Sequence, residues 1–366
     1  MRIVERYTKR MRVFRGSGGW SLLGPLRFVF SAFYGAWSRM TPSPVPTGPS
    51  GSGPKIISVG NIEVGGGGKT PCVLAIASAL TAGGARPAVV TRGYGSRATR
   101  EGGALALPGT ENCAEDIPAA YTVWEGGREA DAARELGDEA VLYIKAGVPL
   151  AVDRDRMRGI DVVTRFADPT HVILDDAFHR TTVPKDLDIL LLDAERPFGN
   201  GRLLPYGTLR EGASATARAG AVVFTRATES IVPEKAVRFT EEIPVFFARH
   251  EPVALTGRDG GHLAAASLTG SKIALFSGIA RHHSFEKTAV GFGLDPEVSF
   301  RYDDHHEYTP DDIAAMMDEC GPGTVFVTTA KDLVKVAPLI PADTRLLVLE
   351  VRMEIDRMED LLAPVL

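Results

Sequence analysis

The sequence predicts an α/β fold whose main part is a parallel sheet with helices on both faces. An N-terminal helix that lies at a membrane interface is predicted to precede this part, and a smaller second α/β lobe is predicted to follow it. Three observations support this prediction. Short apolar runs alternate with helical stretches from residue 55 onward, as expected for buried parallel strands joined by helices. A glycine-rich loop follows the first of these runs and precedes a helix. A basic and aromatic segment fills the first 40 residues.

Size, composition and charge exclude several classes of protein. With 366 residues the chain has room for about two domains. Its 44% hydrophobic and 24% charged residues exclude a disordered chain and a multi-span membrane protein. The net charge of −5 argues against a basic nucleic-acid binder, so we expect no nucleic-acid partner. The cysteines at 72, 113 and 320 lie far apart, which indicates free thiols in an intracellular protein.

The N-terminal segment differs from this average. Six of the first fifteen residues are Lys or Arg, and the apolar stretch Trp20–Met40 follows. Arg27 interrupts that stretch, and a spanning helix needs about 20 apolar residues. Basic residues followed by Trp, Phe and Leu favour a helix lying on a membrane surface, with a core or partner-packing helix and a signal peptide as alternatives. We predict a membrane-associating segment at 1–40 and a Pro/Gly/Ser tether at 41–54.

The rest of the chain is predicted to form a core lobe at 55–240 and a second lobe at 241–366, separated by a segment with antiparallel character near 240–270. The expected strands are Lys55–Val59, Pro87–Thr91, Val148–Val152, His171–Leu174, Ile189–Leu192, Ala221–Thr225, Lys272–Ser277, Thr324–Thr328 and Leu346–Val351. The expected helices are Lys69–Thr81, Gly137–Ala146, Asp153–Phe166, Ser284–Phe292, Pro310–Cys320 and Arg357–Leu362.

The strongest chemical motif is Ile56–Pro71, IISVGNIEVGGGGKTP. A strand, a glycine-rich turn and a helix opening at Lys69 are the parts of a P-loop, in which backbone N–H groups and the helix N-terminus hold phosphate. The fold class is therefore that of a P-loop NTPase. Lys69 is expected to reach the β- and γ-phosphates and Thr70 to bind Mg²⁺. Glu63 stands where the general pattern has its first glycine, and a plain flexible turn is the alternative. Nucleotide contacts are predicted for Gly65, Gly66, Gly67, Gly68, Lys69, Thr70 and Pro71.

Acidic residues end a neighbouring strand. A P-loop enzyme needs such an acid to hold Mg²⁺ or its water, and HVILDD at 171–176 provides Asp175 and Asp176. Adjacent carboxylates repel each other unless a cation lies between them. We predict a metal site formed by Thr70, Asp175 and Asp176, with an ordinary helix cap as the alternative. The strand Asp188–Asp193 also ends in an acid.

Seven motifs together resemble the tetraacyldisaccharide 4'-kinase family of lipid A biosynthesis. They are SVGNIEVGGGGKTP at 58–71, TRGYGS at 91–96, GDE at 137–139, VILDDAFHR at 172–180, LLLDAERPFGNGRLLPYGTLRE at 190–211, DHHEY at 304–308 and VTTAKD at 327–332. The family's own P-loop, GNxxxGGxGKTP, also lacks the first glycine. The N-terminal aromatic segment resembles the membrane-associating helix of the family.

The resemblance implies an ATP-dependent kinase that phosphorylates the 4'-hydroxyl of a tetraacylated glucosamine disaccharide 1-phosphate to give lipid IVA. Its cofactors would be ATP and Mg²⁺, and its partners the lipid A disaccharide precursor and the inner-membrane surface, without an obligate protein partner. Its place would be the cytoplasmic face of the inner membrane of a Gram-negative-type bacterium.

The resemblance also implies roles for individual residues. Asp138 would be the catalytic base and His305 its partner, with Lys69 as the third catalytic residue, although His306 is an alternative to His305. From the sequence alone, Asp138 also fits an ordinary acid in the first turn of a helix. Substrate contacts are expected from Asn61, Arg92, Arg202 and Arg210, although isolated arginines also fit plain ion pairs.

The chain departs from the family at several positions. Ala177, His179 and Arg180 stand where the family has Gly, Gln and His, and Ala330 stands where an acid is usual. Lys331 and Asp332 remain candidates near the nucleotide, and the pair His282–His283 is expected on the surface or in a loop.

Two other functions fit the motifs. A P-loop ATPase or small-molecule kinase in solution would need no anchor. A membrane-tethered nucleotide-binding regulator would bind ATP without transfer chemistry.

Overall fold

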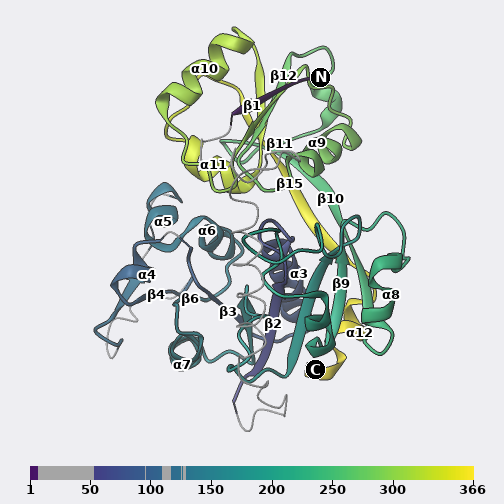
Figure 1. The fold of residues 1–366 in the computed structure, drawn as a ribbon. Coiled ribbons are helices and arrows are strands. Elements are labelled where there is room, and N and C mark those ends of the chain that lie inside the picture. The colour runs from purple at the N-terminus through teal and green to yellow at the C-terminus, as the bar shows by residue number, and fades with distance from the viewer. Residues whose placement is uncertain (7–52, 95, 109–116, 125, 127–128) are drawn as a thin grey trace. The chain divides into compact units, whose positions relative to one another are not determined.

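The computed structural model describes residues 1–6, 53–94, 96–108, 117–124, 126 and 129–366 and divides into two units (Figure 1). Of the described residues, the larger unit comprises those of 53–249 and Met353–Leu366, and the smaller unit comprises Met1–Arg6 and His250–Arg352. This division differs from the predicted boundary at 240/241. The reason is that β10 (Val245–Gly257) begins in the sheet of the larger unit, where Val245–Ala248 pair with β9 (Ala221–Thr225).

A mostly parallel sheet forms the centre of the larger unit. From β10 the strand order is β10-β9-β8-β2-β7-β3-β6-β4-β5, and only the pairing of β4 with β6 is antiparallel among the registers of these described strands. The further strands are β2 (Lys55–Asn61), β3 (Pro87–Thr91), β4 (Gly103–Ala106), β5 (Tyr121–Trp124), β6 (Leu150–Val152), β7 (His171–Asp175) and β8 (Leu187–Asp193).

Helices cover both faces of this sheet. They are α3 (Lys69–Ala82), α4 (Ala98–Glu101), α5 (Glu129–Leu136), α6 (Asp138–Lys145), α7 (Arg156–Ala167), α8 (Glu234–Thr240) and α12 (Met358–Leu362), with 3₁₀ turns η1 (Ala213–Arg218) and η3 (Ala363–Val365). Alternate residues of one strand point to opposite faces. Ile57 packs with α3, α6 and α12, whereas Ile56 packs with α7. The buried, mostly apolar strands therefore form the middle layer of three.

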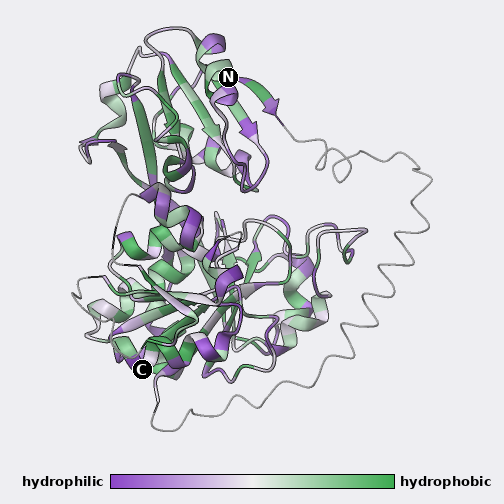
Figure 2. Cartoon of the chain, turned by 90° about the vertical axis from the view of Figure 1, so that its left-hand side faces the viewer, coloured by the Kyte–Doolittle hydropathy of each residue, from purple (hydrophilic) through white to green (hydrophobic). Residues whose placement is uncertain are grey.

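The smaller unit repeats this three-layer arrangement. Its strand order is β1-β13-β12-β14-β15-β10, and β11 pairs antiparallel with β10. Its elements are β1 (Arg2–Arg6), β11 (His262–Leu263), η2 (Ala265–Leu268), β12 (Ile273–Ser277), α9 (His282–Gly291), β13 (Val298–Tyr302), α10 (Pro310–Cys320), β14 (Val325–Thr328), α11 (Ala330–Val336) and β15 (Leu346–Ile355). Phe276 packs with α10 and α11, and Leu275 packs with α9 on the other face. The strands of this unit are accordingly mostly green, hydrophobic, in Figure 2.

The structure confirms the α/β class and every predicted strand and helix, with ends shifted by a few residues. The antiparallel character expected near 240–270 is the β10–β11 pair. Cys72 and Cys320 are free, as expected, and both are buried, whereas Cys113 lies outside the described residues.

Most of the predicted membrane-associating segment and nearly all of the tether also lie outside the described residues. Of the first 40 residues, Met1–Arg6 are described, and Arg2–Arg6 form β1, which pairs parallel with β13. Among the described helices, none combines the length and the apolar run that crossing a membrane requires.

Candidate active site

The glycine-rich segment forms a loop between β2 and α3. Gly65 and Gly68 have φ angles of 114° and 81°, a region that glycine enters without strain. A Cβ at Gly67 would lie 2.6 Å from Asn61 Nδ2, so a larger residue there would displace the Asn61 side chain. Helix α3 begins at Lys69, and its N-cap, Gly68, has no side chain to bind the first N–H groups. The loop therefore has the geometry of a phosphate site.

Lys69 lies inside this loop with contacts to two oxygens. Its Nζ donates to Asn61 Oδ1 at 3.4 Å and lies 3.6 Å from Asp176 Oδ1. Asn61 is buried, and its Nδ2 lies 3.5 Å from the Gly65 carbonyl oxygen. The structure thus places Asn61, predicted as a substrate contact, within the P-loop, where it holds Lys69.

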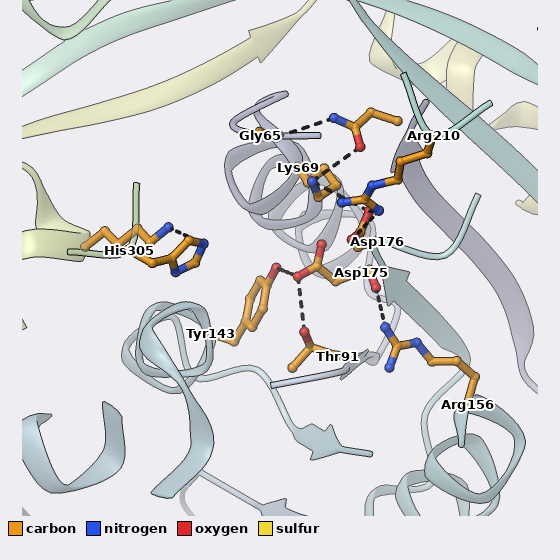
Figure 3. A network of polar contacts seen from close by, with 11 residues as sticks. Gly65, Lys69, Thr91, Tyr143, Arg156, Asp175, Asp176, Arg210 and His305 are labelled. Atoms are coloured by element: carbon orange, nitrogen blue, oxygen red, sulfur yellow. Dashed lines mark hydrogen bonds and ion pairs between the residues drawn. The ribbon is translucent and has the colours of Figure 1, made fainter. Parts of the chain in front are cut away.

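The end of β7 brings Asp176 to the lysine (Figure 3). Asp176 has a φ of 51°, and its oxygens accept bonds from Arg210 Nη1 at 2.9 and 3.1 Å. Although burial opposes ionisation, the charges of Lys69 and Arg210 outweigh it and lower the pKa of Asp176 to about 2. Asp176 is therefore ionised at neutral pH, and Lys69 and Arg210 are its counter-ions.

Asp175 lies in a very different environment from its neighbour. It is 1% exposed, and its Oδ2 accepts bonds from Tyr143 Oη at 3.0 Å and Thr91 Oγ1 at 3.2 Å. Its Oδ1 is buried and has no hydrogen-bond partner among the described residues. Burial, with the nearby carboxylates of Glu139 and Asp176, raises the pKa of Asp175 to about 7, against the influence of Lys69. A buried carboxylate with an unused oxygen is suited to a cation.

The residues at this point fit Mg²⁺. Tyr143 interacts with both Thr70 and Asp175, so these two predicted magnesium ligands lie around the same tyrosine hydroxyl. Within the described ranges, no group of three or more His, Cys, Asp or Glu side chains converges on one point. That is expected for Mg²⁺, which keeps several waters and takes one or two carboxylates plus phosphate oxygens.

Helix α6 carries both Tyr143, which contacts Asp175, and Asp138. Asp138 is the first residue of the helix, after Gly137 with a φ of 102°, and is partly exposed. Five residues on, Tyr143 contacts Asp175, while Glu139 raises the pKa of Asp175. The N-terminal turn of α6 therefore faces the carboxyl end of β7. Sequence reasoning missed Tyr143, because a buried tyrosine on a helix is indistinguishable from a core residue without its partner.

The predicted arginines differ in their surroundings. Arg210 contacts Asp176, whereas Arg92 is exposed after β3, and the exposed Arg202 lies over the Tyr206 ring at 4.5 Å from its centroid. Sequence reasoning missed Arg156, which is buried and donates to the carbonyl oxygens of Asp153 at 2.6 Å and Asp175 at 2.9 Å.

Two further polar groups border the phosphate loop. Asp193 is paired with Arg226 at 2.6 Å, and Arg226 Nη1 also lies 3.3 Å from the Gly66 carbonyl oxygen. The second strand-end acid is thus part of an ion pair beside the P-loop. At one departure from the family, His179, burial lowers the pKa to about 4, so this imidazole is neutral at physiological pH.

Lys185 fixes the loop that carries both aspartates. Its Nζ is buried and donates to the carbonyl oxygens of Ala177 at 2.8 Å and Phe178 at 3.3 Å, and to Asp188 Oδ2 at 2.8 Å. Burial lowers the pKa of Lys185 and raises that of Asp188. The ionised pair depends on these short contacts, because desolvation opposes both charges.

We predict that Lys185→Met lowers the free energy of unfolding by about 3–5 kcal/mol, because Asp188 is left as an uncompensated buried charge. Urea denaturation followed by circular dichroism measures this. Lys145→Met, which removes an exposed pair with Glu129, serves as the matched control and should change stability by less than about 1 kcal/mol. Equal effects of both substitutions would contradict the structural role of Lys185.

The predicted histidines lie in the smaller unit. His305 has a φ of 59°, and its Nε2 lies 3.1 Å from Lys331 Nζ. His306 is stacked on Tyr302 and pairs with Asp312 at 3.1 Å, which gives it a structural role. The expectation of a surface position for His282 is wrong, because its ring is buried against Ser277 Oγ at 2.9 Å, whereas His283 is exposed. The pairing of His305 with Asp138 stays a prediction.

A family model and curated relatives match most of this chain. The family model described as Tetraacyldisaccharide-1-P 4'-kinase matches residues 20–366. A tetraacyldisaccharide 4'-kinase of Anaeromyxobacter sp. (strain Fw109-5) is 34% identical over 85% of this chain and 81% of the relative. The enzyme of that name from Chromobacterium violaceum is 32% identical over 93% of this chain and 89% of the relative.

A solved structure is also similar to this chain in fold and sequence. The crystal structure of LpxK from Aquifex aeolicus in complex with ATP matches with a TM-score of 0.66 and 25% identity, over 94% of this chain and 97% of that one. Residues 20–366, which the family model matches, include the P-loop, the paired aspartates and His305. The chain therefore belongs to the tetraacyldisaccharide-1-P 4'-kinase family.

Proposed function

We propose that this protein transfers the γ-phosphate of ATP to the 4'-hydroxyl of a tetraacylated glucosamine disaccharide 1-phosphate, the precursor of lipid IVA. The observation that carries the proposal is the cluster at the P-loop, where Lys69 lies beside Asp176 and the buried Asp175 has an unused oxygen. The names of the relatives give the acceptor, and the ATP complex of the Aquifex aeolicus protein gives the donor.

Each group at the P-loop has a role in this transfer. The N–H groups of Gly65–Gly68 and Thr70 bind the phosphates at the N-terminus of α3, and Pro71, which has no N–H group, is a proposed nucleotide contact without a hydrogen bond. Lys69 exchanges its contact with Asp176 for phosphate oxygens and stabilises the charge of the transferring group. Thr70, Asp175 and Asp176 would hold Mg²⁺, which neutralises phosphate charge when bound.

Asp138 is the proposed base. The 4'-oxygen forms a bond to the γ-phosphorus, the bond from that phosphorus to the β–γ bridging oxygen breaks, and ADP leaves. The hydroxyl proton passes to the Asp138 carboxylate, and His305 orients that carboxylate. Arg92, Arg202 and Arg210 are the proposed contacts for the anionic acceptor, because guanidinium groups bind phosphate in two-point geometry.

The direct test uses γ-labelled ATP, Mg²⁺ and tetraacyldisaccharide 1-phosphate in detergent with the full-length protein. A labelled bis-phosphorylated lipid is the expected product. ATP hydrolysis without a labelled lipid would favour a simple ATPase, and ATP binding without turnover would favour a regulator. Either result would refute the kinase assignment.

We predict that Asp175→Asn abolishes the enhancement of ATP binding by Mg²⁺, because an amide is a weaker magnesium ligand than a carboxylate. Calorimetric titration with a non-hydrolysable ATP analogue, with and without Mg²⁺, measures the effect. Asp168→Asn changes an exposed aspartate at the end of α7 and should leave the enhancement as in the unmodified protein. A normal enhancement in Asp175→Asn would remove Asp175 from the metal site.

The enzyme is further proposed to work at the cytoplasmic face of the inner membrane. The support is the sequence of the first 40 residues, in which basic residues precede Trp20, Phe28 and Trp37. Co-sedimentation with anionic vesicles tests this. Replacing Phe28, Phe30, Phe33 and Trp37 with Ser should release the protein from vesicles, and unchanged sedimentation would contradict the membrane role of this segment.

A further inference from the structure

The motif TTAKD at 328–332 lies against the loop that carries His305, hereafter the His305 loop (Asp303–His306). Asp332 is fully buried at the start of α11, and its Oδ2 accepts bonds from Thr329 Oγ1 at 2.7 Å and from the Gly278 N–H at 3.1 Å. The Gly278 carbonyl oxygen in turn accepts the His305 N–H at 3.1 Å. Asp332 thus fixes the backbone of His305 through one intervening residue.

This backbone needs such support. His305 has a φ of 59°, a conformation that costs a non-glycine residue about 1 kcal/mol or more. A larger residue at position 278 would be crowded, because a Cβ at Gly278 would lie 3.0 Å from Asp332 Oδ1 and 3.2 Å from His306 Cβ. Residues held in this region despite the cost often belong to functional sites.

The neighbouring residue of the motif contacts the imidazole itself. Lys331 Nζ lies 3.1 Å from His305 Nε2, within hydrogen-bond range, and 3.6 Å from Asp304 Oδ1. Asp304 Oδ1 is 4.0 Å from Nε2, too far for a hydrogen bond. The carboxylate therefore pairs with the ammonium and not with the ring.

The chemistry of these groups decides where the ring proton lies. An ammonium can only donate, so His305 Nε2 must offer its lone pair to Lys331. An imidazole whose Nε2 accepts carries its proton on Nδ1. A doubly protonated ring would place an N–H and a positive charge against the ammonium, which is unfavourable.

We infer that Lys331 is a positioning residue that holds His305 as the neutral Nδ1–H tautomer, so that Nδ1–H is the ring's donor toward a carboxylate or phosphate oxygen. The inference rests on the proposed function, which pairs His305 with Asp138. In that pairing His305 donates from Nδ1 and orients the base, and no proton leaves the ring.

The adjacent histidine provides an internal reference. His306 Nε2 pairs with Asp312, and its carbonyl oxygen accepts from Lys335 Nζ at 3.3 Å. Lys331 and Lys335 are one turn apart on α11; Lys331 contacts a ring nitrogen of His305, whereas Lys335 donates to the backbone carbonyl oxygen of His306. Lys335→Met is therefore the matched control for Lys331→Met.

Long-range ¹H–¹⁵N correlation spectra of the full-length, ¹⁵N-histidine-labelled protein at pH 8 test the inference, with His305→Ala to assign the ring. We expect the Nδ1–H pattern in the unmodified protein, in Lys335→Met and in Lys331→Arg, which keeps a charged donor. In Lys331→Met, the ring should shift toward the Nε2–H tautomer that free histidine prefers. An Nε2–H or doubly protonated His305 in the unmodified protein, or an unchanged tautomer in Lys331→Met, would overturn the inference.

Kinetics separate this inference from the proposed function. Lys331→Met should lower kcat by about 10²-fold with little change in KM for ATP, as expected when a catalytic group is misplaced. Lys335→Met should stay near the unmodified rate. Full activity in His305→Ala would refute the proposed role of His305, while the spectra still decide whether Lys331 sets its tautomer.

Discussion

Lys69→Met should lower the rate of phosphoryl transfer by about 10³-fold or more, because a cation on the transferring phosphoryl group contributes at this scale. In the structure its Nζ lies at the P-loop, 3.4 Å from Asn61 Oδ1 and 3.6 Å from Asp176 Oδ1. Methionine keeps the length of the side chain but cannot replace the charge. The measurement is the initial rate of lipid labelling at saturating ATP.

Stability should change little in this variant, since Asp176 keeps its two contacts with Arg210. Unfolding in urea checks that the loss of rate is not a loss of fold. Lys145→Met removes a lysine from an exposed ion pair and should keep the normal rate. A Lys69→Met enzyme that retains a tenth of the normal rate would exclude Lys69 from the charge stabilisation proposed above.

Asp138→Asn should reduce kcat by about 10²–10⁴-fold while leaving ATP affinity unchanged. The amide has the size of the carboxylate but cannot take the hydroxyl proton. ATP affinity is expected to persist because the P-loop lies between β2 and α3, whereas Asp138 lies on α6. Single-turnover labelling and calorimetric ATP binding give the two quantities separately.

The neighbouring acid is the matched control. Glu139 lies in the same turn of α6 and acts on Asp175 through its charge. Glu139→Gln should therefore alter the pKa of Asp175 without removing the base, and its effect on kcat should be much smaller than that of Asp138→Asn. If the two substitutions were equally damaging, Asp138 would be one of several helix-terminal acids and not the base.

Local sequence was sufficient for the parts of the site that are contiguous in the chain. The strand, glycine loop and helix at 55–82 follow from spacing alone, and Asp175 and Asp176 follow from an apolar strand ending in acids. Such elements are set by hydrophobic pattern and glycine conformation, both of which are local properties.

Contacts between distant segments could not be predicted. Tyr143, Arg156 and Lys185 reach the aspartate loop from other elements, and each resembles an ordinary core or surface residue until its partner is known. Strand β4, with the sequence GALA, is short and lacks β-branched residues, so its strand character comes from pairing with β5 and β6. Strand β1 was hidden by the basic composition of the first fifteen residues.

The ion pairs around Asp176 have a consequence for how the site is filled. At neutral pH the charge of Asp176 is matched by Lys69 and Arg210, whereas Asp175, with a pKa raised to about 7, is only partly ionised. A lone anion such as sulfate must displace Asp176 from its counter-ions and gains little. A triphosphate with its divalent metal brings charges of both signs, and each finds an opposite charge already in place. We therefore expect the loop to bind the metal–nucleotide pair more tightly than either component alone.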